Sequence, residues 1–300
     1  MGKTAKVVQQ HHPDLELISA AELDSLIQTV GSEEVNRRYS LICAMCLGIA
    51  AWAIFKHIRI DASAAVSYYY FSRNYETFRE WKDPVLPDPD FLRLVLSRIP
   101  VIGAMNTKLA AVLKDIAPTA GVHFIGHFVD TYKFAPPVSR REPAQPLVIG
   151  WAGDKAKKSK NYESLLQPIK QYFKHDSGVQ FVETSGENAY DDMPLFYHGL
   201  DLLLMTSANE GGGAPALEAF ACGKPVLSTN VGYIKEAAHR DAHPLILDSD
   251  DPGAFIKTIQ AWMDRRGELE VIGMKCRSEM EMRWSIDKAV HHWTRHLFGR

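Results

Sequence analysis

The chain has 300 residues, of which 46% are hydrophobic and 23% are charged, which is the balance of a globular protein of one or two domains. Its formal net charge of −2 excludes a strong overall attraction to nucleic acid or to anionic lipid. Any anion that it binds must therefore be held by a local cluster of basic groups. The four cysteines are too few for a disulfide framework.

The first half of the chain has a weak pattern of secondary structure. Residues 1–22 are polar and lack the apolar stretch of a secretory signal, so we expect a cytoplasmic protein. Alternation of short apolar runs with a helical pattern predicts an α/β domain over residues 1–135. The expected strands are Val7–Gln10, Ala64–Tyr70, Val101–Ala104 and Val122–Ile125, and a helix is expected at Thr107–Ile116.

An uncharged run, Tyr39–Phe55, lies between basic residues but is shorter than the ~20 residues of a spanning helix. A buried helix of an α/β domain is the first interpretation, and peripheral contact with a membrane surface is the second. Cys43 and Cys46 in this run have CxxC spacing without a second pair. They are expected to be buried thiols, and no metal site is predicted.

A proline-rich stretch, residues 136–146, reads as a linker to a second domain at residues 147–282, with a terminal helix over residues 283–300. In the second domain strands and helices alternate, which predicts a parallel sheet covered on both faces. The expected strands are Leu147–Trp151, Val179–Val182, Leu200–Met205, Pro225–Ser228 and Leu245–Leu247. The expected helices are Tyr162–His175, Met193–His198, Pro215–Ala221, Ile234–His239 and Pro252–Arg265.

Ligands of an open parallel sheet bind outside the carboxyl ends of its strands, and this rule selects three loops. The first loop, Gly153–Lys160, carries four lysines, Lys155, Lys157, Lys158 and Lys160. Ammonium groups at a sheet edge suit a diphosphate, and one or two of the four are expected to contact it. The third loop is Thr229–Gly232.

The second loop, Ser207–Pro215, contains Gly211, Gly212 and Gly213, which suit a close approach of backbone to a ligand. Pro215 then fits the first turn of a helix whose amino terminus favours an anion. Glu210 and Glu218 flank this place and could accept hydrogen bonds from the ribose and sugar hydroxyls of a nucleotide sugar. On spacing alone, a glycine-rich turn with solvent-facing glutamates remains an equal interpretation.

The run Ser207–Gly232 resembles the signature of retaining family 4 glycosyltransferases (glycosyl transferases group 1), which have the GT-B fold. In that family two glutamates with seven residues between them precede an Ala-x-x-Gly-x-Pro-Val strand entry, as do Glu210 and Glu218 here. The first donor-domain strand, the interdomain segment and the terminal helix are also similar. The resemblance covers roughly residues 101–298, and the first domain is short for the family.

The resemblance implies a fold of two Rossmann-like, doubly wound domains facing a cleft, with the terminal helix crossing back to the first. It implies that a sugar moves from a nucleotide-diphosphate sugar, as co-substrate, to an acceptor hydroxyl with retention and without a metal or other cofactor. Glu210 and Lys160 would be catalytic. Donor binding would involve Gly153, Lys155, Gly211, Gly212, Gly213, Ala216, Leu217 and Glu218. A saccharide or lipid-linked saccharide is the implied acceptor, and a nucleic acid acceptor stays open.

The family usually opens with a strand and a glycine-rich loop, whereas the corresponding Val7–Asp14 contains no glycine. A second hypothesis is therefore a non-catalytic protein that binds a nucleotide sugar or is the partner subunit of an active transferase. A third, a glycoside hydrolase with Glu210 and Glu218 as its carboxylates, conflicts with the lysine loop, since hydrolysis needs no diphosphate site. Sugar-nucleotide epimerases of the same fold are the remaining alternative.

Overall fold

The computed structural model describes residues 2–138 and 146–299, and the central part of the expected linker, residues 139–145, lies outside them. The chain forms two compact units. The first comprises Met1–Arg73, Val85–His127 and Ala289–Arg300, and the second comprises Asn74–Pro84 and Phe128–Lys288. A short piece of the first half of the sequence therefore belongs to the second unit.

The first unit contains a four-stranded parallel sheet in the order β1-β2-β3-β4. Its strands are β1 (Cys43–Ala44), β2 (Ala62–Ala65), β3 (Val101–Ala104) and β4 (Gly121–Phe124). Its helices before residue 128 are α1 (Gly2–Gln10), α2 (Ala20–Val30), α3 (Ser32–Arg38), α4 (Leu47–Phe55), α5 (Pro89–Leu94) and α6 (Thr107–Ile116). β3 and α6 occupy the residues predicted for them.

Three predictions for this unit were wrong. The strand expected at Ala64–Tyr70 ends at Ala65, since β2 is Ala62–Ala65. The strand expected at Val7–Gln10 is the end of α1, in which Thr4, Ala5 and Val8 are buried. A spacing of three to four residues between buried positions is that of a helix and not of a strand. The run Tyr39–Phe55 is not one helix, since β1 comes first and α4 follows with nine residues. α4 is partly exposed, with Phe55 63% accessible.

The terminal helix α13 (Ile286–Phe298) belongs to the first unit from Ala289 onward. Its Leu297 packs so closely on β3 that a Cβ at Gly103 would lie 2.9 Å from the Leu297 side chain. The expected return of the carboxyl-terminal helix to the first domain is thereby confirmed. Among the residues that the structure describes, no helix is long and apolar enough to cross a membrane.

The second unit contains a five-stranded parallel sheet in the order β6-β5-β7-β8-β9. The strands are β5 (Leu147–Ala152), β6 (Val179–Thr184), β7 (Leu202–Met205), β8 (Val226–Thr229) and β9 (Ile246–Leu247). All four residues of β7 and all four of β8 are buried, as expected for strands covered on both faces. The parallel sheet predicted for this half is confirmed.

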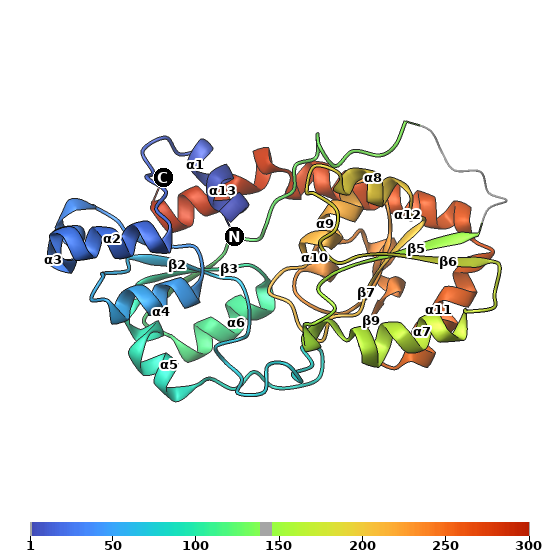
Figure 1. Cartoon of the computed structure of the whole chain (residues 1–300), viewed down its shortest axis with the longest axis horizontal. Helices are drawn as coiled ribbons and strands as arrows, with labels where there is room; N and C mark the ends of the chain where they lie inside the picture. Colours follow the sequence, from blue (N-terminus) through green and yellow to red (C-terminus); the bar gives the residue numbers. More distant parts are fainter. Residues whose placement is uncertain (1, 139–145, 300) are drawn as a thin grey trace. The chain divides into compact units, whose positions relative to one another are not determined.

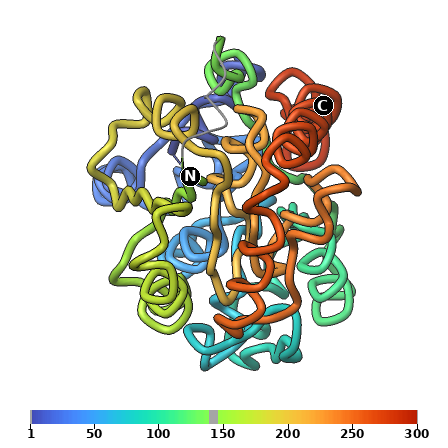
Figure 2. The backbone as a smooth tube through the Cα atoms, turned by 90° about the vertical axis from the view of Figure 1, so that its right-hand side faces the viewer, coloured from blue at the N-terminus to red at the C-terminus, as the bar shows by residue number. Residues whose placement is uncertain are grey.

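Helices cover both faces of this sheet (Figures 1 and 2). In Figure 1, α7 (Gln167–Tyr172) and α11 (Pro252–Met263) lie below the strands, and they contact each other. On the other face, above the strands in Figure 1, lie α8 (Met193–His198), α9 (Ala214–Ala221) and α12 (Arg266–Glu279). The short helix α10 (Ile234–Ala237) follows β8. Since the strands are parallel, the loops that follow β5, β7 and β8 emerge at one edge.

Candidate functional site

The three loops selected from the sequence are joined by hydrogen bonds. The Ala208 amide of the second loop donates to the Ser159 carbonyl of the first over 2.7 Å. The Thr229 hydroxyl of the third loop donates to the Ser207 carbonyl of the second over 2.6 Å. β5, β7 and β8 are adjacent in the sheet, so the loops that follow them start as neighbours. The predicted convergence of the three loops is therefore seen in the structure.

Lys160 and Glu210 form an ion pair between the first and second loops. The Ser207 hydroxyl also donates to Glu210, with Oγ 2.8 Å from Oε1. The Thr206 hydroxyl holds the backbone of Lys160 by donating to its carbonyl over 2.6 Å. The side chains of Lys160 and Glu210 are 20% and 16% exposed, so the pair is fixed and yet open to solvent. The structure thus brings the two predicted catalytic residues together.

The other lysines of the first loop lie in different surroundings. Lys155 pairs with Glu183 at the end of β6 over 2.9 Å, and this hydrogen bond raises the Lys155 pKa. Lys158 is 77% exposed and pairs with Glu76 over 3.2 Å. Lys157 is exposed. Lys160 is therefore the lysine of this loop that the fold directs towards the second loop.

The carboxylate of Glu183, a residue of β6, accepts hydrogen bonds from three side chains. Burial by itself would raise the pKa of this carboxyl, but hydrogen bonds from Lys170, Lys155 and Tyr162 outweigh burial and lower the pKa. The Tyr162 hydroxyl lies 2.9 Å from Glu183. This cluster holds Lys155 beside β6, whereas Lys160 lies nearer to the second loop, which follows β7.

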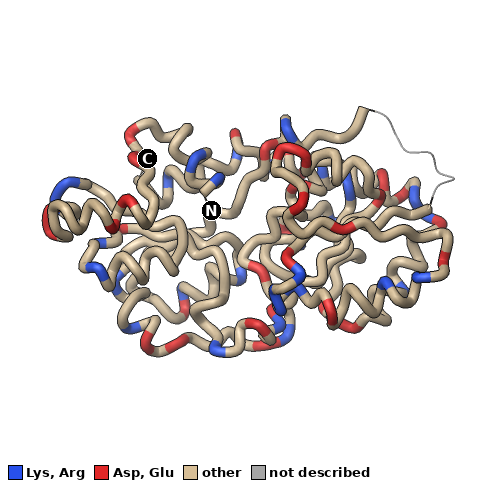
Figure 3. The backbone as a smooth tube through the Cα atoms, in the orientation of Figure 1, with Lys and Arg blue, Asp and Glu red and all other residues tan. Residues whose placement is uncertain are grey.

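Figure 3 shows that basic and acidic residues are interspersed along the described chain.

The glycines of the site are packed against side chains of the protein itself. A Cβ on Gly212 would lie 2.2 Å from the Tyr233 ring, and one on Gly213 would lie 2.6 Å from Met205. A Cβ on Gly153 would lie 2.9 Å from the Trp151 ring. Internal packing against aromatic rings therefore favours glycine at positions 212 and 153, whereas the flexible end of Met205 could move away from a Cβ at position 213. Close contact with a ligand is then not the only reason for the glycine-rich sequence.

α9 begins after Gly213 and has Pro215 in its first turn, where the missing amide hydrogen costs nothing. The Ala216 amide already donates to the Gly213 carbonyl over 2.9 Å. Ala216 and Leu217 are buried in this turn. Their predicted approach to a diphosphate would therefore take place through the backbone at the start of the helix.

Glu218, one turn into α9, is held by Tyr197 of α8, whose hydroxyl donates to Glu218 Oε2 over 2.7 Å. Burial, and then the Glu218 charge, raise the pKa of Tyr197 well above its ordinary value, so this tyrosine stays a donor. Glu210 and Glu218 thus have different partners, Lys160 for the first and Tyr197 for the second. Tyr197 was not singled out from the sequence.

A second residue that was missed is Glu80, which belongs to the second unit. Its carboxylate accepts hydrogen bonds from the backbone amides of Glu210 and Gly232. No spacing or motif around Glu80 marks it in the sequence, because it lies 130 and 152 residues from the two loop residues whose amides donate to it.

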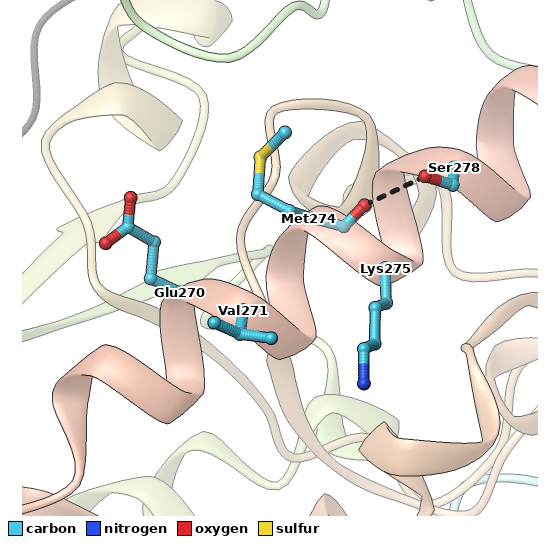
Figure 4. A pocket seen from close by; sticks show the side chains of 5 residues that line it. All are labelled: Glu270, Val271, Met274, Lys275 and Ser278. Carbon is cyan, nitrogen blue, oxygen red and sulfur yellow. Dashed lines mark hydrogen bonds between the residues drawn. The ribbon is translucent and has the colours of Figure 1, made fainter.

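A hollow of about 370 Å³ lies elsewhere in the second unit, on α12. It is lined by Glu270, Val271, Met274, Lys275 and Ser278 (Figure 4). None of these is a predicted site residue, and Lys275 is paired with Asp241 over 2.5 Å. Among the described residues, no three His, Cys, Asp or Glu side chains form a metal-binding group. The four cysteines are free thiols.

The three loops lie in a part of the chain that matches a known protein family. The family described as "Glycosyl transferases group 1" matches residues 138–278, which contain all three loops. A curated relative, D-inositol 3-phosphate glycosyltransferase of Salinispora arenicola, is 35% identical over 77 residues. These residues make up 26% of this chain and 17% of that protein, so the match spans less than a fifth of the relative's length.

Solved structures resemble the chain over nearly its whole length. Sucrose-phosphate synthase of Thermosynechococcus elongatus has a TM-score of 0.69 at 14% identity, covering 95% of this chain and 82% of that one. HepE of Anabaena, solved in complex with UDP-glucose, has a TM-score of 0.65 at 16% identity, covering 99% and 89%. These likenesses show the GT-B fold that the resemblance implied. Through residues 138–278, slightly less than half of its length, the chain is similar to the glycosyl transferases group 1 family.

Proposed function

We propose that the protein transfers a sugar from a nucleoside diphosphate sugar to an acceptor hydroxyl with retention of anomeric configuration. The observation that carries this proposal is the Lys160–Glu210 pair, held where the loops after β5 and β7 meet, beside the start of α9. A cation, a carboxylate and a helix amino terminus on one sheet edge match the charges of such a donor.

Lys160 has the role of stabilising the diphosphate. An ammonium group has three N–H donors, so Lys160 can keep Glu210 and bind phosphate oxygens at once. When the bond between the sugar carbon and the diphosphate oxygen breaks, negative charge develops on that oxygen, and a fixed cation lowers the barrier. Because Lys160 and the start of α9 supply this stabilisation, transfer is expected to proceed without an added metal ion. Lys155, engaged with Glu183, is a weaker candidate for the same role.

The two glutamates have different roles in the proposal. Glu210, at the tip of the second loop, contacts the transferred sugar, and Glu218, held by Tyr197, accepts hydrogen bonds from the ribose hydroxyls. The backbone at Gly153, Gly211–Gly213, Ala216 and Leu217 approaches the sugar and the diphosphate. A saccharide or lipid-linked saccharide as acceptor is part of the proposal and rests on the family resemblance alone.

One observation favours a second function, binding of a nucleotide sugar without transfer. The place where the family usually has a strand and a glycine-rich loop is occupied by α1 and the turn that follows it. A protein of this kind would bind the donor through the second unit and have no turnover of its own. Binding and turnover therefore have to be measured separately.

The test is calorimetry with UDP on the wild-type protein and on two lysine variants of the same loop. Lys160→Ala is expected to weaken UDP binding by about 1.5–3 kcal/mol, the usual value of a hydrogen bond to a charged group. Lys157→Ala, the matched control, should leave binding unchanged because Lys157 is exposed. Equal small losses in both variants would contradict a specific diphosphate site.

Turnover is then measured with UDP-glucose and a panel of other nucleotide sugars, with and without EDTA. Donor consumption that survives chelation supports the transferase. UDP binding without consumption of any donor would leave the second function. Turnover that is abolished by EDTA and restored by manganese would contradict the role assigned to Lys160.

A further inference from the structure

Residues 74–84 belong to the second unit, although the chain on either side of them belongs to the first. They form the cyan loop at the lower edge of Figures 1 and 2. The family match begins at residue 138 and does not include them. What this segment does in the donor-binding unit is therefore a separate question from family membership.

Glu80 connects the segment to two of the site loops. Its Oε2 accepts a hydrogen bond of 3.1 Å from the Glu210 amide, and its Oε1 accepts one of 2.9 Å from the Gly232 amide. The Glu80 amide in turn donates to the Ala208 carbonyl over 3.0 Å. Glu80 is 2% exposed, and a buried carboxylate is costly unless its oxygens are hydrogen-bonded. The two amides contribute to the stability of this charge inside the protein.

Further contacts fix the segment at several points. The Asn209 side chain donates to the carbonyls of Tyr75 and Phe78 over 2.7 and 3.2 Å. Arg79 forms an ion pair with Asp250, which follows β9. Phe78 is buried, at 4% exposed. Contacts to the loops after β7, β8 and β9 show that the segment is an integral part of the unit.

The place at which Glu80 acts is close to the proposed chemistry. It holds the backbone of Glu210, the residue whose side chain pairs with Lys160. It also holds Gly232, where a Cβ would lie 3.1 Å from the Glu210 carbonyl, so the second and third loops are packed on each other here. Loss of the Glu80 carboxylate would release both loops at this contact while Lys160 and α9 keep their own hydrogen bonds.

We propose that Glu80 is a positioning residue for the sugar end of the site, which it orders by holding the amides of Glu210 and Gly232. This inference rests on the proposed function for the role of Glu210. Loss of the Glu80 carboxylate is expected to lower turnover more than nucleotide affinity, because Glu80 does not hold the groups assigned to the diphosphate.

Two substitutions of Glu80 are expected to lower turnover to different extents. Glu80→Gln keeps one acceptor oxygen but turns an NH2 group towards the other amide, so one of the two hydrogen bonds is lost. Glu80→Ala loses both. We expect kcat with a donor sugar to fall about tenfold in Glu80→Gln and about 100-fold in Glu80→Ala, with the UDP dissociation constant changed less than about threefold. The matched control is Glu76→Gln, an exposed acid of the same segment, which should leave both quantities unchanged.

Hydrogen exchange of backbone amides tests the same contact without any activity. Glu80→Gln, the milder variant, should speed exchange at Glu210 or Gly232 at least tenfold, while Glu76→Gln should not. If the wild-type protein neither binds UDP nor consumes a donor, the proposed function fails and exchange alone decides the role of Glu80. Unchanged exchange, or a loss of UDP affinity as large as the loss of kcat, would overturn the inference.

Discussion

The two parallel sheets end in different ways at their carboxyl edges. After β2 and β3 of the first unit, the Tyr68 hydroxyl donates to Asn106 Oδ1 over 3.1 Å, and the Leu109 amide donates to the same oxygen over 2.6 Å. Tyr68 and Asn106 are fully buried. After β5 and β7 of the second unit, Lys160 and Glu210 face each other with 20% and 16% of their side chains exposed.

The difference shows how one architecture supports structure at one sheet and chemistry at another. In the first sheet the polar groups at the strand ends satisfy each other inside the protein, and Asn106 caps α6. In the second sheet the charged groups are fixed by neighbours but remain accessible to a ligand. A fold of this type does not determine function, which depends on the groups that its loops carry.

The largest effect is expected for Glu210→Gln. Turnover should fall about 100-fold, because a carboxylate directed at the reacting sugar is lost. Affinity for UDP should not fall, because Lys160 loses its ion-pair partner and stays available to the diphosphate. Steady-state kinetics and UDP calorimetry measure the two quantities, with the exposed Glu163→Gln as control. A variant that binds UDP more weakly and keeps its turnover would contradict the assignment.

A smaller effect, on stability alone, is expected in the first sheet. Asn106→Ala removes the cap of α6 and one acceptor of the buried Tyr68 hydroxyl, which should lower the free energy of unfolding by about 2 kcal/mol. UDP affinity should stay unchanged. Urea unfolding and calorimetry test this, with Lys114→Ala, exposed on the same helix, as control. If Asn106→Ala lost UDP affinity while its free energy of unfolding stayed unchanged, the structural role assigned to the first sheet would be wrong.

The smallest effect concerns Glu183, whose pKa is lowered in the folded protein. A lowered folded-state pKa contributes stability that is present above the ordinary value of 4.5 and is lost as the pH falls through the folded value. Glu183→Gln should therefore cost about 1 kcal/mol at pH 7 and progressively less below pH 4.5. Urea unfolding at several pH values measures the difference. A cost that grew on acidification would have the wrong sign.

Local signals in the sequence were sufficient for the sheet of the second unit and for most of its helices. Strands alternate there with helices that begin at clear signals, such as Pro215 in α9, and the helix Met193–His198 has the predicted bounds. In the first unit β1 has two residues and α1 follows a polar segment, so periodicity over such short stretches is ambiguous. Helices α2, α3, α5 and α12 were not predicted at all.

By itself the sequence determined the parallel sheet of the second half and the three loops, because these follow from local spacing and the rule for strand ends. The candidate roles of Lys160 and Glu210 came from the family resemblance. Only the tertiary structure decided which lysine meets Glu210, since four lysines in one loop have the same local signal. Only it assigned residues 74–84 to the second unit and placed Glu80 on the amides of Glu210 and Gly232. The physical reason is that such contacts join residues far apart in the chain, and their partners are set by packing and not by neighbouring residues.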